Sequence, residues 1–222
     1  MLVVHHLNNS RSQRVLWALE ELGVPYEVKT FQRDEITNLA PASLKAIHPL
    51  GKSPVITDGD LTLAESGAII EYLVRTYGKG GFIPPASSGA YQSYVYWLHF
   101  AEGSLMPPMV LKLVFDKIVS SPMPFFAKPI AKGIAKKVMT GYVGPTIKDN
   151  LDFIESHLKS HEWFAGDHLS GADFQMSFPL EAWVARNPDD SSYPRIAAYV
   201  KRVHERPAYQ KALNTGGPYD YA

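Results

Sequence analysis

The 222-residue chain contains no cysteine. This absence excludes disulfides, thiolate metal ligands and any protein thiol that could act as a nucleophile or a redox partner. Any sulfur chemistry must therefore come from a bound ligand. The eight histidines show no metal-ligand spacing, so we expect no metal in the site.

The chain also lacks a charge surplus and a long apolar run. Lysine and arginine number 22, and aspartate and glutamate also number 22, so a nucleic-acid partner is not expected. The longest apolar stretch, residues 105–115, is broken by Pro107, Pro108 and Lys112, and the first residues do not resemble a signal peptide. Hydrophobic residues make up 45% of the chain, which is typical of a globular protein. We expect a soluble cytoplasmic protein without a membrane partner.

The first part of the chain alternates between strand and helix patterns. Apolar and β-branched runs predict strands, apolar residues at helical spacing predict helices, and Asp58-Gly59-Asp60 predicts a hairpin turn. The predicted order is β-α-β-α-β-β-α, which describes a mixed sheet with helices. The expected elements are strands at 2–7, 26–31, 55–57 and 61–63 and helices at 15–22, 42–47 and 68–77.

The rest of the chain has helical patterns only. A cluster of glycines and prolines at 78–85 indicates a break. We therefore divide the chain into a domain at 1–80, a linker at 81–88 and an all-helical domain at 89–222. Expected helices cover 89–120, 124–160 with a bend at Gly144-Pro145, 170–186 after a capping box from Ser170 to Asp173, and 193–206.

Polar residues that could carry chemistry fall into three clusters in the first domain. Asn8-Asn9-Ser10-Arg11-Ser12 lies between the first strand and the first helix. A hydroxyl there either caps the helix or takes part in a site for an anion or thiolate, since free N–H groups and the helix dipole favour negative charge. The residues alone leave both interpretations open.

The other two clusters are Gly51-Lys52-Ser53-Pro54-Val55 and Glu65-Ser66. Pro54 enters a strand, where it cannot donate to the sheet; if its peptide bond is cis, the Ser53 backbone can pair with an extended peptide ligand. Ser66 opens a helix and can receive a carboxylate, while Glu65 can pair with an ammonium group. Ser66 could equally be a plain N-cap.

Taken together, these clusters resemble the glutathione transferases, closest to a bacterial and fungal serine-type branch. The resemblance covers nearly the whole chain. It is carried by residues 10–22 (SRSQRVLWALEEL), 51–55 (GKSPV), 58–73 (DGDLTLAESGAIIEYL), 96–106 (YWLHFAEGSLM) and the Ser170–Asp173 box.

The resemblance implies a thioredoxin-like N-terminal domain that binds glutathione and an all-helical C-terminal domain that holds an electrophile, usually in a homodimer. It implies a cis bond at Pro54, with the Ser53 backbone pairing with the cysteinyl part. Glu65 and Ser66 would hold the γ-glutamyl head, and Lys52 would lie near the glycyl end. Ser10 matches the thiol-activating serine.

Arg11 after Ser10 departs from the family pattern, so Ser12 and Asn9 remain alternatives for the thiol contact. No base is placed in the sequence to make Ser10 itself a nucleophile. Candidate residues of the electrophile pocket are Arg11, Glu102, Met106 and Met109.

The predicted function is transfer of the glutathione thiolate to apolar electrophiles, with glutathione-dependent peroxide reduction as a variant. The alternative is a binding or regulatory module of the same fold without turnover. A third alternative is a two-domain scaffold that binds no glutathione.

Overall fold

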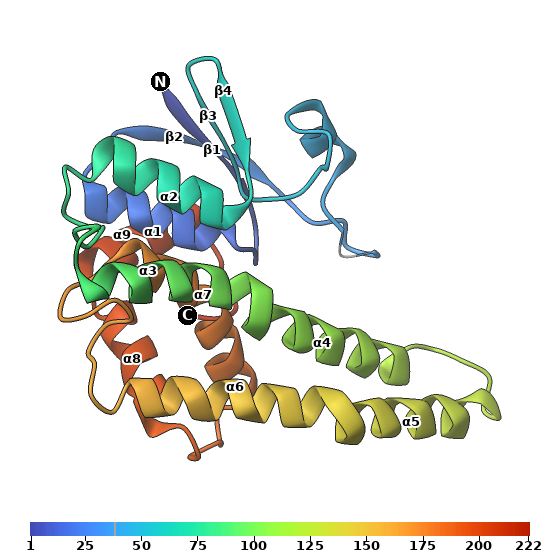
Figure 1. The fold of residues 1–222 in the computed structure, drawn as a ribbon. Coiled ribbons are helices and arrows are strands. Elements are labelled where there is room, and N and C mark those ends of the chain that lie inside the picture. Colours follow the sequence, from blue (N-terminus) through green and yellow to red (C-terminus); the bar gives the residue numbers. More distant parts are fainter. Residues whose placement is uncertain (38) are drawn as a thin grey trace.

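The computed structural model describes residues 1–37 and 39–222. Its N-terminal domain contains one four-stranded mixed sheet in the order β2-β1-β3-β4 (Figure 1). Strand β1 pairs in parallel with β2 and antiparallel with β3, and β3 pairs antiparallel with β4. The central strand β1 is buried along its whole length. The strands are β1 (Leu2–Leu7), β2 (Tyr26–Phe31), β3 (Val55–Asp58) and β4 (Leu61–Ala64).

Two helices of this domain, α1 (Ser12–Leu22) and α2 (Ser66–Tyr77), pack on each other and on α7 of the helical domain (Figure 1). Helix α1 ends at Gly23, which has φ 65°, a left-handed conformation that glycine adopts without steric cost. The predicted strands and these two helices are confirmed. The predicted helix at 42–47 is a short 3₁₀ helix, Ala42–Ala46, which ends shortly before Pro49.

The C-terminal domain is entirely helical. The chain is thus a thioredoxin-like β/α domain followed by an all-helical domain. No helix or strand lies between Tyr77 and Gly89, which includes the predicted linker; the exact boundaries stay a prediction. The helices are α3 (Gly89–Phe100), α4 (Met106–Ser120), α5 (Ala127–Val138), α6 (Gly144–His157), α7 (Gly171–Arg186), α8 (Pro194–His204) and α9 (Pro207–Gly216).

The two long helical segments each contain a π-helical turn, at Ala101–Leu105 and at Met139–Val143. Each turn comes shortly before a proline, Pro107 or Pro145. A proline ring clashes with the carbonyl four residues earlier, and the wider π turn accommodates it without ending the helix. At the position of the predicted bend, Gly144-Pro145, the helix contains the π turn Met139–Val143. The π turn at Ala101–Leu105 was not predicted.

The capping box at the start of α7 is confirmed. The Asp173 carboxylate accepts hydrogen bonds at 2.9 Å from the backbone N–H groups of Ser170 and Phe164. Burial raises the pKa of Asp173 to about 6, despite these bonds. The predicted helix at 193–206 corresponds to α8, but it is shorter than predicted. Helix α9, which follows it, was not predicted.

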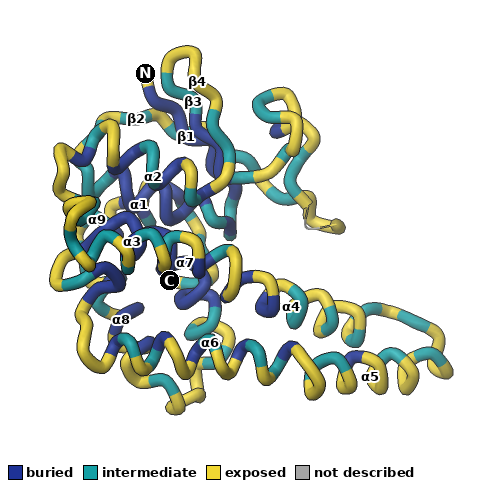
Figure 2. The backbone as a smooth tube through the Cα atoms, viewed as in Figure 1, coloured by how far each residue is buried: buried dark blue, intermediate teal, exposed yellow. Residues whose placement is uncertain are grey.

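Helix α9 packs closely on α1 and joins the end of the chain to the N-terminal domain. Trp17 of α1 is fully buried at this junction, with edge-to-face contacts to Phe174 and Tyr209. Buried residues are concentrated here, whereas α4 and α5 project outward and are mostly exposed (Figure 2). The core therefore holds the two domains together beside the predicted site.

Candidate active site

The loop between β1 and α1 contains a chain of buried hydrogen bonds. The hydroxyl oxygens of Ser10 and Ser12 are 2.8 Å apart, and the Ser12 hydroxyl lies 2.9 Å from Nδ1 of His6. The Ser10 oxygen also accepts a bond from the Ser12 backbone N–H at 3.2 Å. All three side chains are buried. Ser10 therefore accepts from a backbone N–H group near the start of α1 and places its hydroxyl at that end of the helix. Its role toward a thiolate stays a prediction.

His6 lies at the inner end of this chain. Burial lowers the pKa of His6 to about 4, so its ring is neutral. A neutral ring can accept from Ser12 at one nitrogen, and the Ser12 hydroxyl also has the Leu7 carbonyl as an acceptor at 3.2 Å. Either serine can donate in the bond between Ser10 and Ser12.

The two alternatives for the thiol contact are also engaged. Ser12 is fully buried and bonds to the backbone of Leu7 at 3.2 Å as well as to His6. The Asn9 amide donates to the Asp220 carboxylate at 2.8 Å and accepts from the Asp220 backbone at 2.9 Å. The end of the chain therefore closes over this loop, a long-range contact that the sequence does not reveal.

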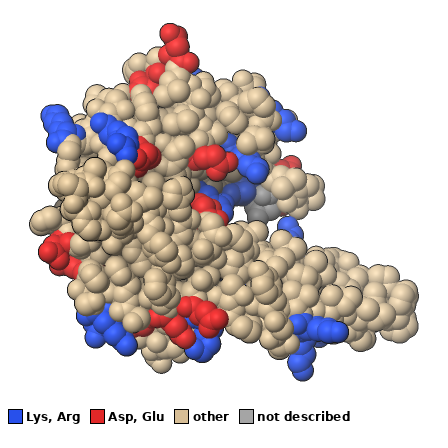
Figure 3. Space-filling model, viewed as in Figure 1, with Lys and Arg blue, Asp and Glu red and all other residues tan. Residues whose placement is uncertain are grey.

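A cavity of about 290 Å³ brings the predicted glutathione residues together. It lies where the loop before α1, the entry to β3, the start of α2 and the π turn after α3 meet. Acidic and basic side chains gather in a recess between the two domains (Figure 3). Ser10 does not line this cavity. The lining residues are Arg11, Leu50, Lys52, Ser53, Pro54, Ala64, Glu65, Ser66 and Glu102.

Pro54 and Ser53 form one wall of the cavity. The Ser53–Pro54 peptide bond is cis, as the family resemblance implied. The Ser53 hydroxyl donates to the carbonyl of His5 at 3.1 Å, which ties this wall to the central strand β1.

Glu65 and Ser66 also line the cavity, next to Ser53 and Pro54 at the same end of the β3–β4 pair. Glu65 has φ 70°, which is uncommon for a residue other than glycine and often occurs at functional sites. The Ser66 oxygen accepts hydrogen bonds from Arg14 at 3.3 Å and from Gln175 at 3.1 Å. Both bonds use the oxygen, so the Ser66 hydroxyl hydrogen stays available to donate to a ligand carboxylate.

Two arginines share one carboxylate at the base of the site. Glu102 accepts from Nε of Arg11 at 2.8 and 3.0 Å and from Nη1 of Arg14 at 3.1 Å. Burial alone would raise the pKa of Glu102, but Arg14 and Arg11 together lower it. Both guanidinium groups also lie over the ring of Phe178, at 5.5 and 5.1 Å. The cluster has one positive charge more than negative.

Part of this charge lies at the cavity, because Arg11 lines it. Among the described residues, neither Nη nitrogen of Arg11 has a hydrogen-bond partner, and Nε and Nη2 of the fully buried Arg14 have none either. Arg14 and Gln175 were not predicted as site residues. Arg14 lies in the first turn of α1, directly after the predicted loop, which could have suggested it. Gln175 comes from α7 and left no local signal.

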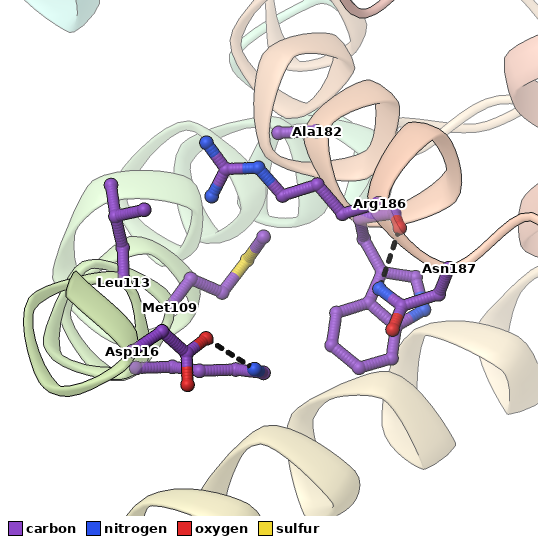
Figure 4. Close-up of a pocket in the computed structure, with 8 residues that line it drawn as sticks. Met109, Leu113, Asp116, Ala182, Arg186 and Asn187 are labelled. Carbon is purple, nitrogen blue, oxygen red and sulfur yellow. Dashed lines mark hydrogen bonds and ion pairs between the residues drawn. The ribbon is translucent and has the colours of Figure 1, made fainter. Parts of the chain in front are cut away.

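The candidate electrophile residues lie in different places. Arg11 and Glu102 line the 290 Å³ cavity described above. Met109 lines a second cavity of about 280 Å³ between α4 and α7, and its side chain points into it together with that of Leu113 (Figure 4). Met106 is buried and lines neither cavity. The second cavity also contains Lys112, Asp116, Ala182, Trp183, Arg186 and Asn187.

Within residues 1–37 and 39–222, no group of three or more acidic, histidine or cysteine side chains could hold a metal ion. In the same part of the chain, no helix is both long and apolar enough to span a bilayer.

Fold and site define a thioredoxin-like protein with a helical second domain and a polar cavity between the two. Comparison with known proteins agrees. Residues 1–75 match the family "Glutathione S-transferase, N-terminal domain", and residues 118–207 match "Glutathione S-transferase, C-terminal domain".

Similar proteins cover nearly the whole chain. Glutathione S-transferase 3 of Schizosaccharomyces pombe is 40% identical over 94% of this chain and 85% of its own length. Glutathione S-transferase 1 of Saccharomyces cerevisiae is 33% identical over 94% and 92%. The crystal structure of a glutathione S-transferase from Actinobacillus pleuropneumoniae has a TM-score of 0.83 and 38% identity, and the match covers 100% of this chain and 95% of that one.

The chain therefore belongs to the glutathione S-transferase family. At this level of identity it is a glutathione S-transferase, with fungal and bacterial enzymes among its relatives.

Proposed function

We propose that this enzyme transfers the sulfur of glutathione to a small apolar electrophile, with the residues of the 290 Å³ cavity binding the tripeptide. The observation that carries the proposal is that one cavity joins two separate motifs, Lys52-Ser53 and Glu65-Ser66. Residues 1–80 would bind glutathione, residues 81–88 link the domains, and residues 89–222 hold the electrophile.

The charges of the site support this ligand. Glutathione at neutral pH has two carboxylates and one ammonium group, in addition to its thiol. Glu65 matches the ammonium group, and the free Ser66 hydroxyl with the N-terminal N–H groups of α2 matches the neighbouring carboxylate. The exposed Lys52 matches the glycyl carboxylate. The Ser53 backbone would pair with the cysteinyl part, as the family resemblance implies.

The sulfur would lie near the N-terminus of α1, where Ser10 is the proposed hydroxyl donor. A free thiol has a pKa of about 8.5, and lowering it by ~2 units requires ~2.7 kcal/mol of preferential thiolate stabilisation. A hydrogen bond from Ser10, the helix N-terminus and the positive surplus of Arg11, Arg14 and Glu102 all act in this direction. The thiol proton leaves to solvent, sulfur bonds to the electrophilic carbon, and the leaving group departs with its electron pair.

The electrophile would approach along α7. Phe178 contacts the two arginines, and Ala182, one turn further on the same helix, lines the second cavity with Met109. Methionine adapts to apolar ligands of varied shape. The enzyme would act as a homodimer, and the same thiolate would also serve glutathione-dependent peroxide reduction.

Binding and turnover are tested separately. Calorimetry with millimolar glutathione should show saturable binding, and a chlorodinitrobenzene assay should show conjugation; cumene hydroperoxide tests the peroxidase variant. We expect Glu65→Gln to weaken glutathione binding about tenfold or more, because the proposed ion pair with the ammonium group is lost. Glu27→Gln, an exposed position on β2, is the matched control.

Binding without turnover would support the non-catalytic alternative. Absence of saturable binding would reject the proposed site and its function together.

A further inference from the structure

The part of the molecule that the glutathione site does not use is a projection formed by α4 and α5. These helices pack antiparallel to each other and extend away from the body of the helical domain (Figure 1). We define residues 106–138 as the arm. Its residues are mostly exposed or only partly buried, unlike those at the domain junction (Figure 2).

One face of the arm is apolar and exposed. In both helices the exposed apolar residues recur every four positions. Each comes one residue before a buried or partly buried position. These less exposed positions are 111, 115 and 119 on α4 and 127, 131 and 135 on α5. In an antiparallel helix pair, residues that come one position before the less exposed row of each helix lie on the same side of the pair. The two exposed stripes therefore share one face. The stripes are Val110, Val114 and Ile118 on α4 and, from the N-cap of α5 onward, Phe126, Ile130 and Ile134.

The loop between the helices continues this face. Phe125 is 89% exposed and Phe126 66% exposed, at the tip of the arm. The side of the arm that faces the viewer shows few charged side chains (Figure 3). Single exposed apolar residues are normal on protein surfaces, but a contiguous apolar face indicates a binding surface.

The charge of the arm is unlike that of the whole chain. The whole chain has equal numbers of acidic and basic residues, yet the arm contains six lysines and one acidic residue, Asp116, which pairs with Lys112. Lys128, Lys132 and Lys136 recur every four residues on α5 and are exposed. Each lies two residues from an apolar position of the stripe, so the lysines occupy the opposite side of the helix. Among the described residues, no acidic group pairs with them.

We propose that the arm binds the surface of an anionic phospholipid bilayer. An exposed apolar face with lysines on the other side is the arrangement of helices that lie in the membrane interface. Phe125, Phe126 and Ile130 would enter the acyl boundary, and the lysines would extend along it to the phosphates. A second copy of the arm could cover the apolar face, but it would add six lysines against one aspartate.

This proposal revises the expectation of no membrane partner. That expectation was based on the absence of a long apolar run, which excludes a spanning helix but not a surface contact. The proposal is independent of the glutathione site, because none of the arm residues named here lines that cavity.

The test is co-sedimentation of the full chain with vesicles. Phosphatidylcholine vesicles with 30 mol% phosphatidylglycerol should bind the protein, whereas pure phosphatidylcholine should bind it at least tenfold less, and 0.5 M NaCl should weaken binding to the anionic vesicles. The double variant Phe125→Ser/Phe126→Ser should reduce partitioning at least tenfold. Lys128→Gln/Lys132→Gln should reduce it about fivefold for each lysine removed.

Controls come from other exposed positions. Ile36→Ser, at a residue 92% exposed outside the arm, and Lys159→Gln should bind like the parent protein. All four variants should conjugate chlorodinitrobenzene at the parent rate in vesicle-free buffer, so loss of activity cannot be confused with loss of lipid binding.

Failure to sediment with anionic vesicles, or equal binding by the arm variants and the parent, would overturn the proposal. Light scattering identifies the main alternative. If the phenylalanine pair variant converts a dimer to a monomer and the parent ignores vesicles, a second copy covers this face and the proposal is wrong.

Discussion

The proposed glutathione cavity and the arm differ in how charge and apolar surface are arranged. At the cavity, Glu102 pairs with two arginines, and buried hydrogen bonds hold the Ser66 hydroxyl oxygen. On the arm, Lys128, Lys132 and Lys136 have no acidic partner among the described residues, and apolar side chains face solvent. A preorganised site suits a small ligand of defined charge, whereas an unpaired surface suits an extended partner. The difference predicts that mutations in the two regions act on different properties.

The largest expected effect is at the core beside the cavity. Trp17→Ala should lower the free energy of unfolding by about 3–5 kcal/mol, because it empties a fully buried site and removes two aromatic contacts. Urea unfolding measures it. A loss below 1 kcal/mol would mean that the junction collapses around the gap and that the contrast with the arm is overstated.

Next is the shared carboxylate. Glu102→Ala should lower the free energy of unfolding by about 2–3 kcal/mol. The reason is that the fully buried Arg14 loses its carboxylate partner. Glutathione binding measured by calorimetry should also weaken as the two guanidinium groups lose their positions. Glu71→Ala is not a suitable control, because Glu71 bonds to Tyr94 and Arg75; the exposed Glu27→Ala is, and it should change neither property.

The third effect is acid destabilisation through His6. Its folded-state pKa of about 4 lies below the ordinary 6.5, so the neutral form is favoured in the folded state. The stability it contributes is complete above pH 6.5 and is lost as the pH falls toward 4, by about 2 kcal/mol at pH 5. Asp173, whose pKa is raised to about 6, acts in the opposite direction, so only a variant isolates His6.

His6→Asn should therefore lose less stability than the parent between pH 7 and pH 5, with urea midpoints as the measurement. The exposed His168→Asn should keep the parent's pH dependence. Parallel curves for His6→Asn and the parent would contradict a buried neutral ring.

A smaller effect is expected at Ser10. Ser10→Ala should lower kcat/KM about tenfold, equal to ~1.4 kcal/mol, and raise the apparent pKa of the pH–rate profile by about one unit. The exposed Ser160→Ala is the control. Full activity with an unchanged profile would show that the hydroxyl only serves the Ser12–His6 chain, and would shift thiolate stabilisation to Arg11.

The smallest effect is expected on the arm. Phe125→Ala should change the free energy of unfolding by less than about 0.5 kcal/mol, because the side chain already faces solvent. Lys112→Ala removes the exposed Lys112–Asp116 ion pair. It should also change the free energy of unfolding by less than about 0.5 kcal/mol. Thermal unfolding that drops by several degrees for either variant would mean that the arm is part of the cooperative core.

Local patterns predicted most of the fold. The strand and helix order of the first domain, Gly23 as a helix end and the Ser170–Asp173 box all depend on residues within a few positions of one another. The residues that form the cavity walls, Ser53 and Glu65-Ser66, were also predicted, because their motifs are short and the family resemblance orders them.

What could not be predicted depends on distant contacts. Gln175 on α7 reaches Ser66 across 109 positions, and the Ser10 hydroxyl belongs to a hydrogen-bonded chain that ends at a buried histidine ring. The apolar stripe of the arm has an ordinary helical period, and periodicity alone does not show which face the rest of the molecule leaves uncovered.

The bonds between Asn9 and Asp220 join positions separated by 211 residues. During synthesis on the ribosome, the strand and helix that flank Asn9 emerge early, but this loop acquires its last hydrogen bonds only after residue 220 has been made. A nascent chain that already contains the complete sheet would therefore still lack the final form of the loop where we propose that the sulfur binds, and full competence for glutathione would arise late in translation.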